Sequence, residues 1–368
     1  MFNRAYYLLI GAMCLAAPTL SVAADQAEEY RERINRGTVG IISGGVNGTY
    51  IRIATDLANV LDHRDDLRIL AIMGKGSVQN IDDILYLKGI DIGIVQSDVF
   101  AFIKRQKKHA TIDQRVHYIT KLYNEEFHLL ADKSIKNIED LAGKKVNFGV
   151  QGSGTYMTAS IVFDTLKVDV NPVSFDQGLA LEKIKRGEIS ALVYVAGKPT
   201  SLFKDVDAKD SVHLLDIPLT DEILDTYLPS RISSEDYPQI VPAGQSVDTL
   251  AVGAVMAVYN WGPGTARYRK VSHFIESFFR RFDEFQSPPR HPKWREVSLT
   301  AVVPGWTRFG PAEAWLKKSA IAGSGELRTA FEAFVKSQAP SLANRLASDT
   351  EKEELFNLFL LWQSRYQQ

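Results

Sequence analysis

Two glycine-rich segments contain the residues whose types and spacing are best suited to bind a small molecule. They are Ser43–Thr49 (SGGVNGT) and Gln151–Thr155 (QGSGT), and each lies between an apolar, β-like run and a helical pattern. Backbone N–H groups at a helix start have no partner within the helix, and the positive end of the helix dipole lies there. Glycine allows close approach of the backbone, and Ser and Thr hydroxyls add donors. Each segment therefore predicts a site for a carboxylate or phosphate, the alternative being a plain turn.

The motifs of common enzyme sites are incomplete in this sequence. Gly149–Gly154 (GVQGSG) does not have the GxGxxG spacing of a dinucleotide site, and there is no GxxxxGK[ST] phosphate loop. Gly244–Asp248 (GQSVD) does not have the last glycine of a hydrolase elbow. Asp205–Asp210 (DVDAKD) does not have the glycine of a calcium-binding EF-hand loop, and the seven histidines form no HExxH motif. We therefore expect no catalytic residue, no metal site and no cofactor.

A series of apolar runs places both glycine segments in the same structural context. The order strand, glycine segment, helix, strand, helix, glycine, strand occurs twice, and Gly89 and Gly187 each end a helix. Ile53, Leu57 and Val60 form one face of the helix after the first segment. This repeated pattern predicts two α/β lobes. The expected strands are 38–42, 67–72, 90–95, 145–150, 171–175 and 189–195.

Two further apolar runs, 127–131 and 249–259, are expected to cross between the lobes. They predict a first lobe formed by 37–125 plus 250–320, a second lobe formed by 126–249, and a C-terminal helical extension at 321–368. Ligands of α/β sheets bind at the carboxyl ends of the strands, so the two glycine segments are expected to face each other across a cleft.

The N-terminus has the features of a secretory signal peptide over residues 1–24. Arg4 precedes the apolar run Tyr6–Ala17, and Ser21–Ala24 are small residues suited to cleavage. An uncleaved anchor is the alternative, but it would need about 20 apolar residues. The mature chain, about 340 residues, would be periplasmic and contain no cysteine, because Cys14 is the only one.

The charge balance argues against a nucleic-acid partner. The chain has 43 basic and 44 acidic residues, a net charge of −1, and loss of the leader with Arg4 makes it −2. Nucleic-acid-binding domains need a basic surface.

Five segments in series resemble the TAXI family, the solute receptors of TRAP transporters, over about residues 37–260. The resemblance implies a type II periplasmic-binding-protein fold that closes on its ligand like a flytrap, and a sodium-driven membrane permease as partner. It also implies a small carboxylate or amino acid as ligand, such as glutamate or 2-oxoglutarate. The segments are SGGVNGTY at 43–50, GKGSVQN at 74–80, DIGIVQSD at 91–98, DLAGKKVNFGVQGSGT at 140–155 and AGKP at 196–199.

The resemblance also carries ligand-binding roles onto residues of both lobes and onto the first crossover. A ligand-binding accessory protein of a membrane sensor is the alternative function, and an enzyme on the same fold is a third. The ligand-binding residues implied are Ser43, Gly44, Gly48, Thr49, Tyr50, Gly76, Ser77, Gln96, Ser97, Glu125, Gly152, Ser153, Gly154, Thr155, Tyr156 and Gly197.

Overall fold

The computed structural model describes residues 17–63, 66–109, 111–206 and 209–320. The chain divides into two compact units, Met1–Phe309 and Gly310–Gln368. In the second unit, residues 310–320 are helical. The C-terminal helical extension expected at 321–368 lies outside the described residues, as do residues 1–16 of the expected signal peptide. Within the described residues, no helix is both long and apolar enough to cross a bilayer.

The first half of the sheet in Met1–Phe309 consists of parallel strands β1 and β2 on one side and β1 and β3 on the other. Strand β3 is buried over its whole length, as expected for a strand covered on both faces. Ile53, Leu57 and Val60 of α3 are buried, which confirms the predicted apolar face of that helix. The elements are α2 (Ala17–Arg36), β1 (Thr38–Ile42), α3 (Thr49–Leu61), β2 (Arg68–Ile72), α4 (Ser77–Tyr86), β3 (Ile92–Gln96), α5 (Val99–Arg105) and α6 (Ile112–Arg115).

The second half repeats this plan with parallel pairs β5–β6 and β5–β7. Helix α8 ends where the sequence predicts, because Gly187 adopts a positive φ of 69° just after it. The elements are η1 (Ile138–Leu141), β5 (Lys145–Asn147), α7 (Gly154–Thr165), β6 (Asn171–Val173), α8 (Gln177–Lys185), β7 (Ala191–Ala196), η2 (Ser201–Asp205), β8 (Val212–Leu214), α9 (Asp221–Leu224) and β9 (Leu228–Ser233).

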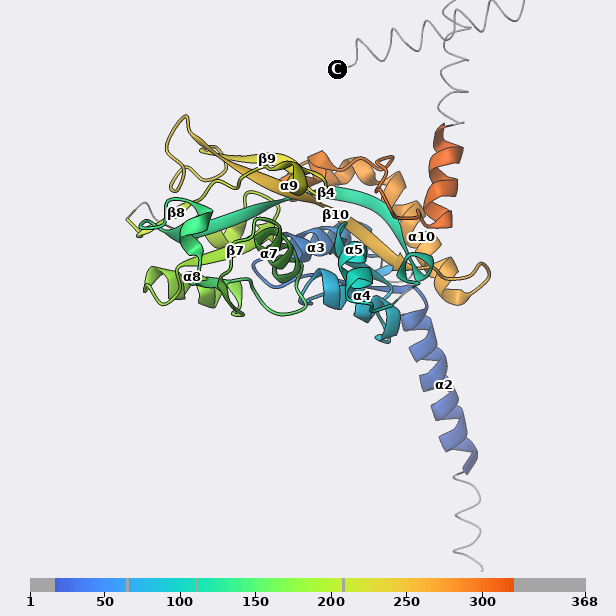
Figure 1. The fold of residues 1–368 in the computed structure, drawn as a ribbon. Coiled ribbons are helices and arrows are strands. Elements are labelled where there is room, and N and C mark those ends of the chain that lie inside the picture. Colours follow the sequence, from blue (N-terminus) through green and yellow to red (C-terminus); the bar gives the residue numbers. More distant parts are fainter. Residues whose placement is uncertain (1–16, 64–65, 110, 207–208, 321–368) are drawn as a thin grey trace, which may run out of the picture. The chain divides into compact units, whose positions relative to one another are not determined.

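Two long antiparallel strands, β4 (Val116–Asp132) and β10 (Ser246–Tyr259), run through both halves (Figure 1). They contain the two apolar runs expected to be crossovers. Strand β10 pairs with β3 and strand β4 with β7, so hydrogen bonding continues from one half to the other. The sheet order is β2-β1-β3-β10-β4-β7-β5-β6, with β8 on β4 and β9 on β10.

This topology confirms the predicted fold class, an α/β fold of the periplasmic-binding-protein type. Two parallel half-sheets, each covered by helices, are joined by a pair of antiparallel strands. The residue boundaries of the two lobes stay a prediction.

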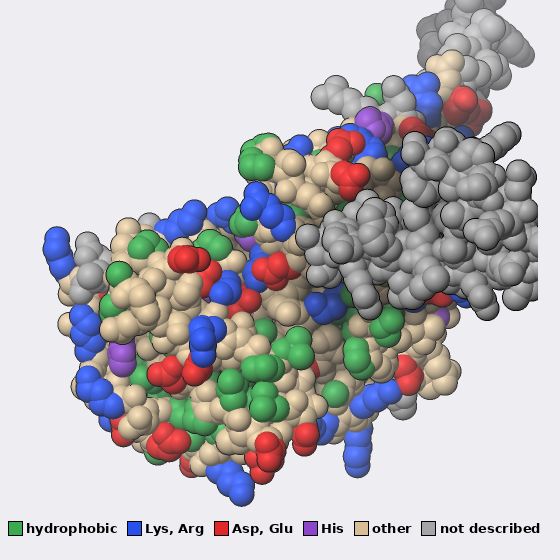
Figure 2. Space-filling model, turned by 90° about the horizontal axis from the view of Figure 1, so that it is seen from above, with side chains coloured by type: hydrophobic (Ala, Val, Ile, Leu, Met, Phe, Trp, Pro, Cys, Tyr) green, Lys and Arg blue, Asp and Glu red, His purple; other side chains and the backbone are tan. Residues whose placement is uncertain are grey.

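The chain returns to the first half after β10. Helix α10 (Ala266–Arg280) packs on α3 and β1, and η3 (Phe282–Phe285) packs on α3. The short helix η4 (Pro292–Glu296) contacts β4. Viewed from above, acidic and basic side chains are interspersed over the surface, in line with the near-zero net charge (Figure 2).

Candidate functional site

A cavity of about 270 Å³ lies between the two halves of the sheet. The first half contributes the segments that follow β1 and β2 and the end of β3. The second half contributes the segment after β5, the start of α8 and the end of β7. The cavity therefore lies at the carboxyl ends of the parallel strands, where α/β sheets bind ligands. Its lining consists of Gly44, Gly45, Asn47, Gly48, Thr49, Tyr50, Gly74, Lys75, Gly76, Ser77, Gln96, Glu125, Val150, Ser153, Gly154, Thr155, Asp176, Gln177, Tyr194, Val195 and Ala196.

Four helices begin at this cavity. Thr49 starts α3, Ser77 starts α4, Gly154 starts α7 and Gln177 starts α8, and all four residues line the cavity. Each start presents backbone N–H groups and the positive end of a helix dipole. The cavity thus favours a negatively charged group.

The four helix starts differ in how their N–H groups are satisfied. In α7, the Ser153 hydroxyl accepts a hydrogen bond from Tyr156 N, and in α8 the Asp176 carboxylate accepts one from Gly178 N. Within the described residues, no side chain caps α3 or α4, whose N-cap residues are Gly48 and Gly76. The first-half helices therefore leave their N-terminal donors available to a ligand.

Glu125 of β4 is the buried acid of the cavity, with 3% of its surface exposed. The Tyr50 hydroxyl donates to its Oε2 at 2.6 Å. Burial raises the pKa of Glu125 to about 8, with further upward contributions from Glu126 and Asp98. At neutral pH this carboxyl group is mainly protonated, so it can donate a hydrogen bond into the cavity as well as accept one.

The charged groups on the cavity wall besides Glu125 are Lys75 and Asp176, both of them solvent-exposed. The Asp176 carboxylate is already occupied as the cap of α8. Lys75 forms no ion pair with any side chain in the part of the chain that the structure describes. Lys75 is therefore available to a ligand as a cation.

Direct contacts join the two halves around the cavity. Gln79 N of α4 donates to Gly152 O at 3.0 Å. The Thr158 hydroxyl of α7 donates to Asp98 Oδ2 at 3.3 Å, and the Tyr227 hydroxyl donates to the same oxygen at 3.1 Å. The structure is thus a closed arrangement of the two halves.

Glycines allow the closest part of this approach. An ideal Cβ on Gly154 would lie 2.1 Å from Gln96 Oε1 and 2.6 Å from Ser77 Oγ, both in the first half. An ideal Cβ on Gly76 would lie 3.4 Å from Gly154 N. Side chains at Gly154 are therefore incompatible with this closed arrangement.

The structure brings most of the sequence-predicted residues to the cavity. Whether they bind a ligand stays a prediction. The lining includes Gly44, Gly48, Thr49, Tyr50, Gly76, Ser77, Gln96, Glu125, Ser153, Gly154 and Thr155.

Five predicted residues lie outside the lining. The Ser43 hydroxyl donates to Ile72 O, and Ser97 O accepts from the Trp306 indole. Gly152 has a positive φ of 86° and uses its carbonyl to bind Gln79 N. Tyr156 packs against the ring of Phe148, and Gly197 accepts from Thr49. These residues shape the walls from behind.

Sequence reasoning missed several lining residues, notably Lys75, Asp176, Gln177 and Tyr194. Lys75 stands within GKGS, a segment that the sequence had already drawn attention to. Asp176 and Gln177 follow a short strand and open a helix, which is the same signal that identified the glycine segments. For Tyr194 there was no local signal, because it is one of several apolar residues in a buried strand.

Solved structures with a related arrangement carry low sequence identity. The alkanesulfonate-binding protein SsuA from Xanthomonas axonopodis pv. citri, bound to MOPS, is 13% identical, with a TM-score of 0.40 over 67% of this chain and 74% of that chain. A variant of the arginine-binding protein ArgBP from T. maritima is 16% identical, with a TM-score of 0.38 over 70% of this chain and 93% of that one. A protein described as a periplasmic transporter is 13% identical, with a TM-score of 0.46 over 76% and 92%.

The comparison with protein families covers more than half of the sequence. Residues 41–287 match the NMT1-like family. This range contains both glycine segments, both long strands and every residue that lines the cavity. The chain belongs to the NMT1-like family.

Proposed function

We propose that this protein is a periplasmic solute receptor that captures a small carboxylate or amino acid and delivers it to a membrane permease of the TRAP type, as a TAXI-like receptor. The observation that carries the proposal is the convergence of four helix N-termini on one cavity between two halves of the sheet. Burial of a ligand on both sides is how proteins of this fold hold a solute. The resemblance of the five sequence segments to TAXI receptors supports the choice of permease.

The donor chemistry of the cavity supports an anionic group on the ligand. Uncapped N–H groups of α3 and α4 and the Lys75 ammonium group favour a carboxylate. Among the described residues, no arginine lines the cavity, so recognition depends on N–H groups, hydroxyls and Lys75. The Glu125 carboxyl group provides a second polar contact deep in the cavity, for an acceptor group or an ammonium group of the ligand.

A thermal-shift panel of 2-oxo acids, dicarboxylates and amino acids tests the ligand class. A ligand at about 100 times its Kd stabilises the folded state by about 2.7 kcal/mol. Each kcal/mol moves the midpoint of a domain of this size by about 2–4 °C, so the true ligand raises Tm by roughly 5–10 °C.

Lys75→Met should reduce this rise, and Lys88→Met, at an exposed position outside the cavity, is the matched control. A panel in which no compound moves Tm would contradict the assignment of a small carboxylate or amino acid. Solute uptake by proteoliposomes that contain a TRAP permease tests the delivery step. Uptake that does not depend on added receptor would contradict that step alone.

A further inference from the structure

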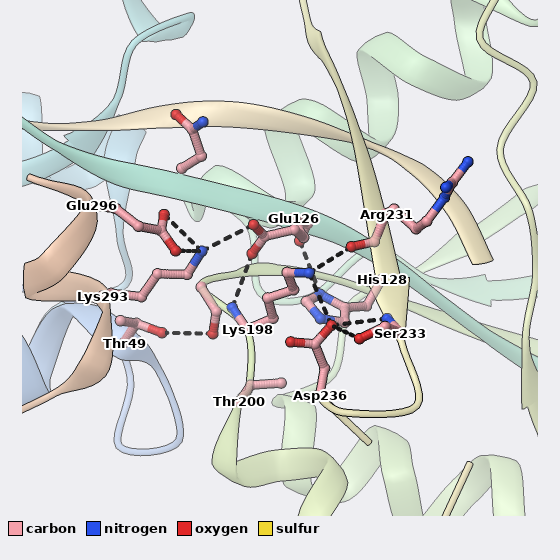
Figure 3. Close-up of polar contacts among 12 residues, drawn as sticks. Thr49, Glu126, His128, Lys198, Thr200, Arg231, Ser233, Asp236, Lys293 and Glu296 are labelled. Carbon is pink, nitrogen blue, oxygen red and sulfur yellow. Dashed lines mark hydrogen bonds and ion pairs between the residues drawn. The ribbon is translucent and has the colours of Figure 1, made fainter. Parts of the chain in front are cut away.

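The peptide group between Gly197 and Lys198, just after β7, is hydrogen-bonded at both ends. The Thr49 hydroxyl of α3 donates to Gly197 O at 3.3 Å, and Lys198 N donates to Glu126 Oε2 at 2.9 Å (Figure 3). Because the carbonyl and the N–H belong to one peptide unit, each hydrogen bond polarises the other. Thr49 lines the cavity and belongs to the first half, whereas the peptide follows the last strand of the second half.

Glu126 is in turn held by a buried lysine. Lys293 Nζ of η4 lies 2.9 Å from Glu126 Oε1, and the two side chains are only 1% and 4% exposed. The same ammonium group lies 2.8 Å from the half-exposed carboxylate of Glu296. An ideal Cβ on Gly197 would lie 3.1 Å from two carbons of the Lys293 side chain, so the lysine packs directly behind the peptide. Burial raises the pKa of Glu126, and Lys293 opposes the rise.

The segment that carries Lys293 is fixed to the same helix that carries Thr49. Asp56 of α3 accepts hydrogen bonds through Oδ2 from His291 N at 2.9 Å and from Trp294 Nε1 at 3.0 Å. These two residues flank Lys293 closely in sequence. Contacts therefore form a closed ring, from Thr49 through the peptide, Glu126 and Lys293 to Asp56 and back along α3.

The second half holds the same loop from its own side. The Tyr237 hydroxyl accepts from Thr200 N at 2.8 Å and donates to His128 Nε2 at 2.9 Å. The Lys198 ammonium group lies 2.8 Å from Asp236 Oδ2 and donates to Arg231 O at 2.6 Å (Figure 3). These bonds lie within the second half, so they can persist when the halves separate. Among the contacts of this peptide group, the bond from Thr49 is the one that opening would break.

We infer that the Gly197–Lys198 peptide is the surface on which the N-terminus of α3 closes over a bound solute, and that Glu126 and Lys293 are positioning residues that hold this peptide for Thr49. The inference rests on the proposed function, because it gives the proposed capture of a solute its closing contact. It assigns a role to a buried ion pair that lies outside the cavity lining.

Distances between the two halves test the contact made by Thr49. Spin labels are attached at Lys88→Cys and Arg186→Cys, exposed positions just after α4 and α8, in a chain that also carries Cys14→Ser. Addition of 2-oxoglutarate or L-glutamate should shift the wild-type distribution to the short distance of the closed structure. Thr49→Val should retain less of that population and should weaken binding of the probe about 2- to 10-fold, as expected for one hydrogen bond. Thr55→Val, an exposed position of α3, is the matched control.

Three variants test the positioning pair. Lys293→Met leaves the Glu126 carboxylate buried without its closest cation, and it should lower the closed population and speed hydrogen exchange of the Lys198 amide. Glu126→Gln combined with Lys293→Met removes both charges and keeps an acceptor for Lys198 N. This double variant should stay folded and still show less closure than the wild type. Glu296→Gln changes only the half-exposed partner, and its Lys198 amide should exchange as in the wild type.

The outcomes separate this inference from the proposed function. A Thr49→Val chain that closes as fully and binds as tightly as the wild type would overturn the inference. An unchanged Lys198 amide in Lys293→Met would overturn the positioning role. If neither probe binds the wild type, those ligands are excluded, and the unliganded distances decide the inference. A short-distance population that Thr49→Val reduces supports it, whereas no such population, or one that does not respond, contradicts it.

Discussion

The two glycine-rich segments have similar sequences but differ in how their helices begin. At the start of α3 the N-cap is Gly48, and no described side chain satisfies the N–H groups there. At the start of α7 the N-cap is Ser153, whose hydroxyl already accepts from Tyr156 N. Gly48 has an ordinary negative φ of −87°, whereas Gly152 of the second segment has a positive φ of 86°.

This difference indicates a division of roles between the segments. The first segment leaves donors open to a ligand, and the second is internally satisfied and approaches the first half closely through Gly154. Similar sequence patterns therefore predict a similar place in the fold, but they do not predict the same contact with a solute. Three predictions can break or sharpen this comparison.

Gly154→Val should have the largest effect. An ideal Cβ at this position would lie 2.1 Å from Gln96 Oε1, so the halves cannot close, and ligand affinity should fall about 100-fold or more. The unliganded protein can relieve the clash by opening, so its Tm should change much less. Isothermal titration and thermal unfolding measure the two effects, with Thr165→Val on the same helix as the control. Ligand affinity within a few-fold of the wild type would show that α7 does not need to approach the first half.

Glu125→Gln should change the pH dependence of stability. The pKa of Glu125 is raised from 4.5 to about 8 in the folded state, so the folded state binds more protons than the unfolded state between these values. The free energy of unfolding contributed by this group therefore falls as pH rises through this window, by at most about 1.4 kcal/mol per pH unit. Glutamine does not titrate, and the variant should lose this slope.

The measurement is the difference between wild-type and variant unfolding curves, because other buried groups also titrate. The pKa of Asp98 is raised to about 6 by burial, which gives a slope of the same sign. The pKa of His128 is lowered to about 4 by burial, which gives a slope of the opposite sign. Glu182→Gln on the exposed side of α8 serves as the control. Parallel curves for the wild type and Glu125→Gln would refute the assignment of a protonated Glu125.

Ser153→Ala should have the smallest effect on binding and a measurable effect on stability. Loss of the N-cap acceptor should reduce the free energy of unfolding by about 1 kcal/mol. Affinity for the ligand should stay nearly unchanged, because this hydroxyl is already used within α7. Denaturant unfolding with Ser160→Ala as the control measures the first effect. A large loss of affinity would show that Ser153 contacts the ligand, and the contrast between the two segments would disappear.

Local features of this protein follow from the sequence alone. Apolar spacing identified the face of α3 that carries Ile53 and Leu57, because a helix repeats every 3.6 residues. Glycine after a helix identified the end of α8 at Gly187, because a positive φ costs glycine little. The glycine segments were placed at strand ends for the same local reasons. These features depend on residues a few positions apart, so the order of residues determines them.

Only the tertiary structure decided which side chains meet. Ser43 stands in a predicted binding segment but turns to Ile72 O, while Tyr194 reaches the cavity from a strand that the sequence marked only as buried. Lys293 meets Glu126 across 167 positions of the chain. Such contacts depend on how β4, β7 and η4 pack, and packing is set by the fit of whole surfaces rather than by spacing along the chain. The sequence determined where a site would form, and the packed fold decided which residues line it and which residues hold them in place.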